Sequence, residues 1–85
     1  MQLVRGNHYF VRTPSGIDYV GKLAEIDGPF TITLTQASWV SDSGRLGEFM
    51  REGRTSNMEI EPIGEIMIHF SAIAPWNHKL FTEAV

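Results

Sequence analysis

Apolar and polar side chains alternate along residues 30–35, where Phe30, Ile32 and Leu34 are separated by threonines. A period of two predicts a strand with one apolar face and one polar, β-branched face. Runs of aromatic and β-branched residues bounded by turn residues predict further strands. The expected strands are residues 8–13, 17–27, 30–39, 58–61, 65–70 and 73–79, with turns at 14–16, 27–29 and 62–64. The chain is therefore expected to be mostly β.

The second expected strand changes its apolar phase partway. Ile17 and Tyr19 occupy odd positions, whereas Ala24 and Ile26 occupy even positions, and Gly21 lies between the two sets. A glycine at such a change indicates a β-bulge or a sharp bend. A bent strand of this kind can serve two sides of a small barrel.

The pattern switches to a helical period after the third strand. Leu46, Phe49 and Met50 follow the i, i+3, i+4 spacing of one helix face, which predicts a short helix over residues 44–52. Asp42 or Ser43 can cap its N-terminus, and a glycine follows its C-terminus at position 53. So short a helix is not stable alone, so we expect its apolar stripe to pack on the barrel.

Composition excludes several classes of protein. Eighty-five residues make one small domain, here residues 1–85, and 42% apolar with 20% charged residues is ordinary for a globular protein. The net charge of −3 argues against a nucleic-acid binder, which usually carries a basic surplus. There is no cysteine, no apolar run long enough to span a bilayer and no signal-peptide pattern at the N-terminus. We therefore expect a cytoplasmic protein.

The strand order predicts a small SH3-like or Sm-like β-barrel of five or six strands, with the short helix inserted after strand three. The spacing Gly16…Gly21-Lys-Leu23…Asp27…Leu34…Ala37 resembles the first Sm motif, and Ile66-Met-Ile-His-Phe-Ser-Ala-Ile73 resembles the second. In that family an Asn after the turn and an Arg-Gly pair bind RNA. Here Thr31 and Phe70-Ser71 occupy those positions. The resemblance therefore implies the fold without the RNA-reading residues.

A second resemblance involves the string Ala37-Ser-Trp-Val-Ser-Asp-Ser-Gly-Arg45. It is similar to a group of small bacteriophage proteins that share a strand ending in Ala-x-Trp, a polar corner with Gly-Arg, and a short helix. The group has no settled activity. The resemblance implies a phage origin and a role in the host cytoplasm during infection.

The same corner supplies the candidate ligand-binding residues, which are Trp39, Asp42, Ser43, Gly44 and Arg45. An aromatic ring can stack on a base, and backbone N–H groups at a helix start beside an arginine suit a phosphate. The alternative interpretation makes Trp39 a core plug and Asp42 or Ser43 a helix cap, with Arg45 paired to an acid such as Glu48. Caps are common, so the alternative has the higher prior.

The sequence contains no pattern typical of catalysis. His8, His69 and His78 lack the close spacing of metal ligands, and no nucleophile elbow is present. We therefore expect no enzyme activity, no metal and no cofactor. Acidic residues at 59, 61 and 65 flank turns and expected edge strands, where charges usually block edge-to-edge pairing.

A further set of residues has two interpretations of equal weight. Met58, Met67, His69 and Trp76 form either an exposed interface patch or a second small core under the helix. Small barrels with open edges commonly associate through those edges, so we expect a homo-oligomer.

These features rank the functional hypotheses. The first is a non-catalytic binding module, by analogy with phage proteins an oligomeric sponge that sequesters a nucleotide or another phosphate-bearing host-defence signal. The second is an inhibitor that binds a host protein, and the third is Sm-like RNA binding. A structural role in the virion stays open.

Overall fold

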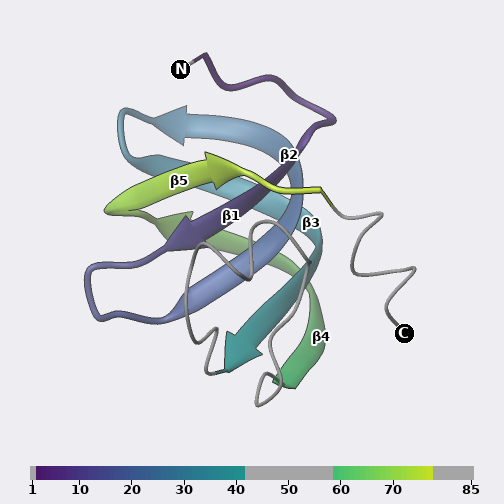
Figure 1. Cartoon of the computed structure of the whole chain (residues 1–85). Coiled ribbons are helices and arrows are strands. Elements are labelled where there is room, and N and C mark those ends of the chain that lie inside the picture. Colours follow the sequence, from purple (N-terminus) through teal and green to yellow (C-terminus); the bar gives the residue numbers. More distant parts are fainter. Residues whose placement is uncertain (1, 42–58, 78–85) are drawn as a thin grey trace.

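The computed structural model describes residues 2–41 and 59–77, and in this part of the chain every regular element is a strand. The expected helix at 44–52 lies outside the described residues. Five strands are formed, as the mostly-β prediction requires (Figure 1). They are β1 (His8–Arg12), β2 (Asp18–Gly28), β3 (Thr31–Ser41), β4 (Glu59–His69) and β5 (Ala72–Pro75).

The five strands make one antiparallel sheet in the order β4-β3-β2-β1-β5. Long, strongly curved β2, β3 and β4 bend around the shorter β1 and β5 (Figure 1). The described strands of the predicted small barrel do not close it, because the two outer strands, β4 and β5, do not pair with each other. The short β5 already pairs with β1, and its last residue, Pro75, has no N–H to donate. An edge position suits this strand, because proline is disfavoured in a central strand of a sheet.

The predicted irregularity at Gly21 is confirmed. The pairing of β2 with β3 shifts register between Val20 and Lys22, on either side of this glycine. A Cβ built on Gly21 would lie 3.1 Å from the Cα of Ala37 and 3.2 Å from the Cβ of Leu34. A side chain at position 21 would therefore fit only if β3 moved away by a few tenths of an ångström, because β3 lies so close to β2 at this point.

The prediction of two short strands on either side of residues 62–64 is wrong. β4 continues through this segment as one strand of 11 residues. Pro62 lies opposite Ser38, and proline is tolerated here because β4 is an edge strand. Gly64 has φ +86° and lies opposite Ala37 at an irregularity in the register. The turn-forming residues thus bend the strand without ending it.

Two clusters of buried side chains hold the sheet together. The larger one contains Tyr9, Val11, Leu23, Ile32, Leu34, Ala37, Ile68 and Phe70. The smaller one contains Phe10, Val20, Val40 and Trp76, with Ile60 packed against it. Trp76 is only 9% exposed, so it belongs to a second small core and not to an exposed patch. Met58, from the same predicted patch, lies outside the described residues.

Candidate functional site

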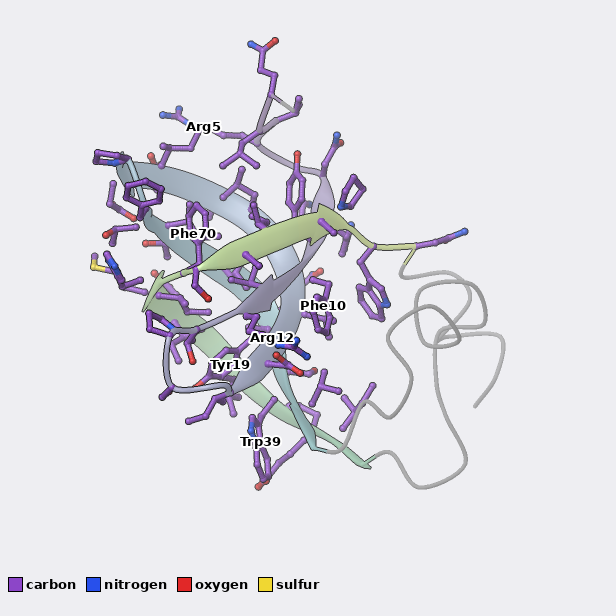
Figure 2. All side chains as sticks on the ribbon, turned by 60° about the vertical axis from the view of Figure 1, so that its left-hand side comes forward. Arg5, Phe10, Arg12, Tyr19, Trp39 and Phe70 are labelled. Carbon is purple, nitrogen blue, oxygen red and sulfur yellow. The ribbon has the colours of Figure 1, made fainter. Side chains whose placement is uncertain are left out.

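Trp39 lies near the end of β3 with its side chain 37% exposed. Its cross-strand neighbours are Tyr19 on β2 and Glu61 on β4. The exposed ring contradicts the interpretation of Trp39 as a core plug. In Figure 2 the side chain lies at one end of the molecule, away from Arg5 and Phe70. An exposed aromatic ring fixed on a sheet can contact a ligand without moving.

A bulge in β3 decides which face Trp39 occupies. Gln36 has φ +50°, and the four residues of β3 from Thr35 to Ser38 lie opposite only three residues of β2, from Val20 to Lys22. One extra residue reverses the alternation of side chains along a strand. Leu34 and Ala37 consequently both reach the larger core, although one position is even and the other odd. Trp39, two residues further on, continues that same face and extends it beyond the buried core.

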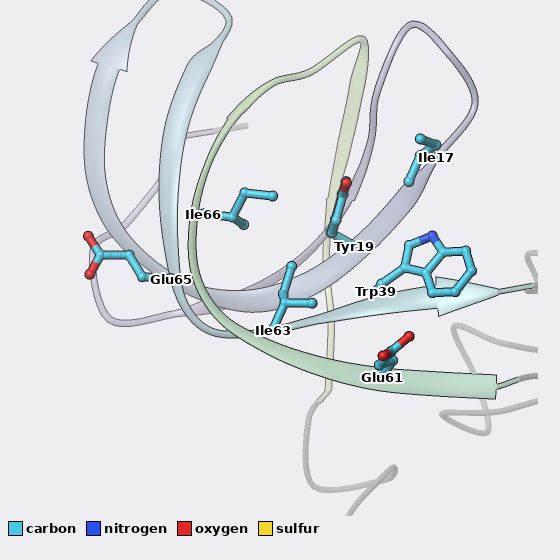
Figure 3. A pocket seen from close by; sticks show the side chains of 7 residues that line it. All are labelled: Ile17, Tyr19, Trp39, Glu61, Ile63, Glu65 and Ile66. Atoms are coloured by element: carbon cyan, nitrogen blue, oxygen red, sulfur yellow. The ribbon is translucent and has the colours of Figure 1, made fainter.

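An open groove of about 470 Å³ surrounds this ring (Figure 3). Its lining residues are Ile17, Tyr19, Trp39, Glu61, Ile63, Glu65 and Ile66, and we call it the Trp39 groove. Tyr19 and Ile66 also pack against the larger core, so the groove is the solvent-open continuation of that core. Its volume falls within the range of small-ligand sites, roughly 300–1,000 Å³.

The turn between β1 and β2 holds Ile17 at the rim of the groove. Arg12 Nε donates to Asp18 Oδ1 at 2.7 Å and Arg12 Nη2 donates to Asp18 Oδ2 at 3.0 Å. The Thr13 N–H donates to the Ile17 carbonyl at 2.9 Å, and the Ile17 N–H donates to Thr13 Oγ1 at 3.1 Å. These bonds tie the two ends of the turn together. The side chain of Ile17, 42% exposed, is therefore presented from a constrained backbone.

The Arg12–Asp18 pair also has an electrostatic consequence. The hydrogen bond that Arg12 donates to Asp18, and then the negative charge of Asp18, raise the pKa of Arg12 above the ordinary arginine value, and partial desolvation opposes these two effects. Asp18 is buried at 6% exposure, so its carboxylate needs such a partner. The pair stabilises the turn from outside the groove and takes no part in lining it.

Among the described residues, carboxylates are the only charged groups that line the groove. Glu61 and Glu65 contribute them from β4, and neither takes part in the ion pairs of the described residues, which join Arg5 with Glu25 and Arg12 with Asp18. Within residues 2–41 and 59–77, no three histidine or acidic side chains are grouped to hold a metal ion. The groove therefore offers apolar contact, two aromatic rings and negative charge.

The structure places one of the five predicted site residues, Trp39, in the groove. The other four, Asp42, Ser43, Gly44 and Arg45, lie outside the described residues, as does Glu48. Tyr19 was not predicted from the sequence as a site residue. Glu61 and Glu65 were expected only to block edge-to-edge pairing of the sheet. Both acids do lie on the edge strand β4. The pairing of Trp39 with Tyr19 and Glu61 across the sheet could not be predicted without the register.

A second exposed apolar surface lies at the other end of β3. Met67 is 64% exposed and Phe30 is 58% exposed. The Phe30 ring packs edge to face against the rings of His69 and Phe70, with centroid separations of 6.4 and 6.1 Å. Met67 and His69 are thus exposed, as the interpretation of an interface patch expects, whereas Trp76 is buried. Of the described residues, none belongs to a helix long and apolar enough to cross a membrane.

Comparison of the chain with protein-family models, with curated proteins and with solved structures gives no match. The chemistry of the Trp39 groove is therefore argued from its own residues.

Proposed function

We propose that the protein is a non-catalytic binding module and that its ligand occupies the Trp39 groove. The observation that carries the proposal is the partly exposed Trp39 ring inside an open, mainly apolar groove. Concave, mainly apolar surfaces with a few polar groups are typical of binding sites. Aromatic side chains on a rigid support contribute strongly to binding, because little conformational entropy is lost when they are covered.

The ligand that best fits the groove is a segment of a partner protein. On this proposal the protein acts as an inhibitor that binds a host factor. The groove is open to one side and its walls include Ile17 and Ile63, both 42% exposed. Exposed aliphatic side chains around a tryptophan resemble the centre of a protein interface. Glu61 and Glu65 repel a phosphate placed near them, which disfavours an anionic ligand within the groove itself.

The second candidate is a nucleotide or another phosphate-bearing host-defence signal, sequestered and not cleaved. The exposed indole of Trp39 favours it, because such a ring can stack on a base. The phosphate would have to be bound by Ser43, Gly44 and Arg45, because the two glutamates of the groove would repel it. The phage origin, the anti-defence role and the host cytoplasm belong to this proposal through the resemblance stated above.

A homo-oligomeric sponge and an SH3-like or Sm-like relationship are also part of the proposal. The unpaired outer strands of the described sheet, β4 and β5, support association through edges. The strongly bent five-stranded sheet supports the fold relationship. RNA binding ranks last because the net charge is −3.

One experiment tests the site and separates the two ligands. Wild type and Trp39→Ala are incubated with linear and cyclic nucleotides, and the melting temperature and any product are measured. The same two proteins, immobilised, are exposed to host lysate. Phe30→Ala is the matched control, since it removes an exposed aromatic ring at the other end of β3.

The proposal expects one stoichiometric partner that wild type and Phe30→Ala retain and Trp39→Ala loses. Nucleotide binding would instead raise the melting temperature by mass action and would identify the second candidate. Equal binding by Trp39→Ala and wild type would overturn the site, and turnover of a nucleotide would overturn the non-catalytic role.

A further inference from the structure

Two aromatic rings and one carboxylate lie in a row across three strands. Tyr19 is the cross-strand partner of Trp39, and Trp39 is the partner of Glu61. Side chains directly opposite each other have Cβ atoms roughly 4.5–5.5 Å apart, so neighbours in this row can contact the same ligand group. Figure 3 shows Trp39 with Tyr19 on one side and Glu61 on the other.

The charge in the groove is unbalanced. Glu61 and Glu65 are both exposed, and the lining residues within 2–41 and 59–77 include no lysine or arginine. The faces of the two aromatic rings carry negative electrostatic potential, as the carboxylates do. A cation placed between the Trp39 ring and Glu61 gains a cation–π contact and a charge-assisted hydrogen bond together. The groove therefore favours a positively charged group.

The remaining walls limit what can accompany that cation. Ile17, Ile63 and Ile66 supply aliphatic contact next to the charged position. A hydrated inorganic ion would leave these walls uncovered. Arginine fits both requirements, because its planar guanidinium stacks on aromatic rings and binds a carboxylate with two parallel hydrogen bonds.

The neighbouring sheet edge indicates that the ligand is a peptide. Glu61, Ile63, Glu65 and Ile66 all belong to β4, which is the outer strand of the sheet. An edge strand presents backbone N–H and C=O groups that an extended segment can pair with. β4 pairs with β3 without a register shift from Glu59 to Pro62, the stretch that holds Glu61, and again from Ile66 to His69, with an irregularity at Gly64 between the two stretches. An extended peptide can therefore pair with the edge and place alternate side chains in the groove.

We propose that the Trp39 groove and the adjoining edge of β4 bind an extended segment of a partner protein that carries an arginine next to apolar side chains, with the guanidinium between Trp39 and Glu61. The inference rests on the proposed binding function and narrows it to one ligand chemistry. It excludes acidic peptides and free phosphates as ligands of this groove.

The test uses an acetylated and amidated peptide, Thr-Leu-Arg-Leu-Thr, titrated calorimetrically into the full chain. Its matched control replaces arginine by citrulline, which keeps the shape and removes the charge. The arginine peptide is expected to bind at least ten-fold more tightly than the citrulline peptide. Glu61→Gln should abolish most of this preference, whereas Glu25→Gln, which breaks an exposed ion pair with Arg5 outside the groove, should leave it unchanged.

The outcomes separate this inference from the broader function. Equal binding of both peptides, with loss of binding in Trp39→Ala, keeps the groove as a binding site and overturns the requirement for a cation. An arginine preference that survives in Glu61→Gln also overturns the inference. No saturable binding of the arginine peptide up to millimolar concentration overturns it as well. The proposed binding site itself fails if ligand captured from the host lysate is retained by Trp39→Ala.

Discussion

Replacing Gly21 by alanine tests the close approach of β2 and β3 that positions the Trp39 groove. The added Cβ would lie 3.1 Å from the Cα of Ala37, 3.2 Å from its Cβ and 3.2 Å from the Cβ of Leu34. The optimal separation of carbon atoms is about 3.5–4.0 Å, so all three contacts are too short by a few tenths of an ångström. One of them involves backbone, which cannot rotate away.

Two opposing effects set the size of the change. Overpacking of a well-packed core costs about 1–3 kcal/mol. Gly21 does not have a positive φ, so alanine is not strained by the backbone, and it lowers the entropy of the unfolded chain. That effect stabilises the folded state by roughly 0.4–1 kcal/mol. We expect Gly21→Ala to destabilise the protein by about 1–2 kcal/mol, with a fall in melting temperature of roughly 4–8 °C for each kcal/mol.

Gly28→Ala is the matched control, because it lies on the same strand and also lacks a positive φ. Its added Cβ would meet only Thr31, at 3.8 Å and beyond, which is an ordinary contact. Urea unfolding followed by fluorescence measures both variants, and Gly28→Ala should match or exceed the wild type. If Gly21→Ala were as stable as Gly28→Ala, the strands would be free to separate and the steric argument would be refuted.

Two further predictions concern the framework of the site. Arg12→Ala should lower stability by about 1.5 kcal/mol, near the low end for charge-assisted hydrogen bonds, because its side chain is 42% exposed. Because the pKa of Arg12 is raised in the folded state, the stabilisation from its charge is fully present below the ordinary arginine pKa and is lost only above it. The arginine charge should therefore add no pH dependence between about pH 6 and 9, as denaturation curves can check. Leu34→Ala, at a fully buried position, should cost about 3 kcal/mol in the same assay, and a loss below 1 kcal/mol would contradict its place in the larger core.

Much of the fold follows from local sequence patterns. Alternation at residues 30–35 predicts β3, and the phase change at Gly21 predicts the irregularity in β2. Pro75 predicts an edge position for the last strand. These features are local, because a strand's faces and a glycine's missing Cβ act within a few residues.

Tertiary pairing decided the features that local patterns did not. Pro62 and Gly64 look like the end of a strand, yet β4 continues through them because pairing with β3 resumes on the far side. Trp76 is buried because β5 carries it against the side chains of the smaller core. Whether the sheet closes into a barrel likewise depends on pairing between the two outer strands, and no single segment of the sequence encodes that pairing.

In the candidate site, too, local sequence predicts one part and tertiary pairing determines the rest. Sequence alone selected Trp39 as a candidate ligand-binding residue, because an aromatic beside a polar corner suits a ligand. The bulge at Gln36 determined the face on which this ring lies, and no glycine or proline of β3 marks that bulge. The register then placed Tyr19 and Glu61 beside the ring. These neighbours could be found only from the structure, because one inserted residue reverses every later side chain of a strand and thereby changes its cross-strand partners.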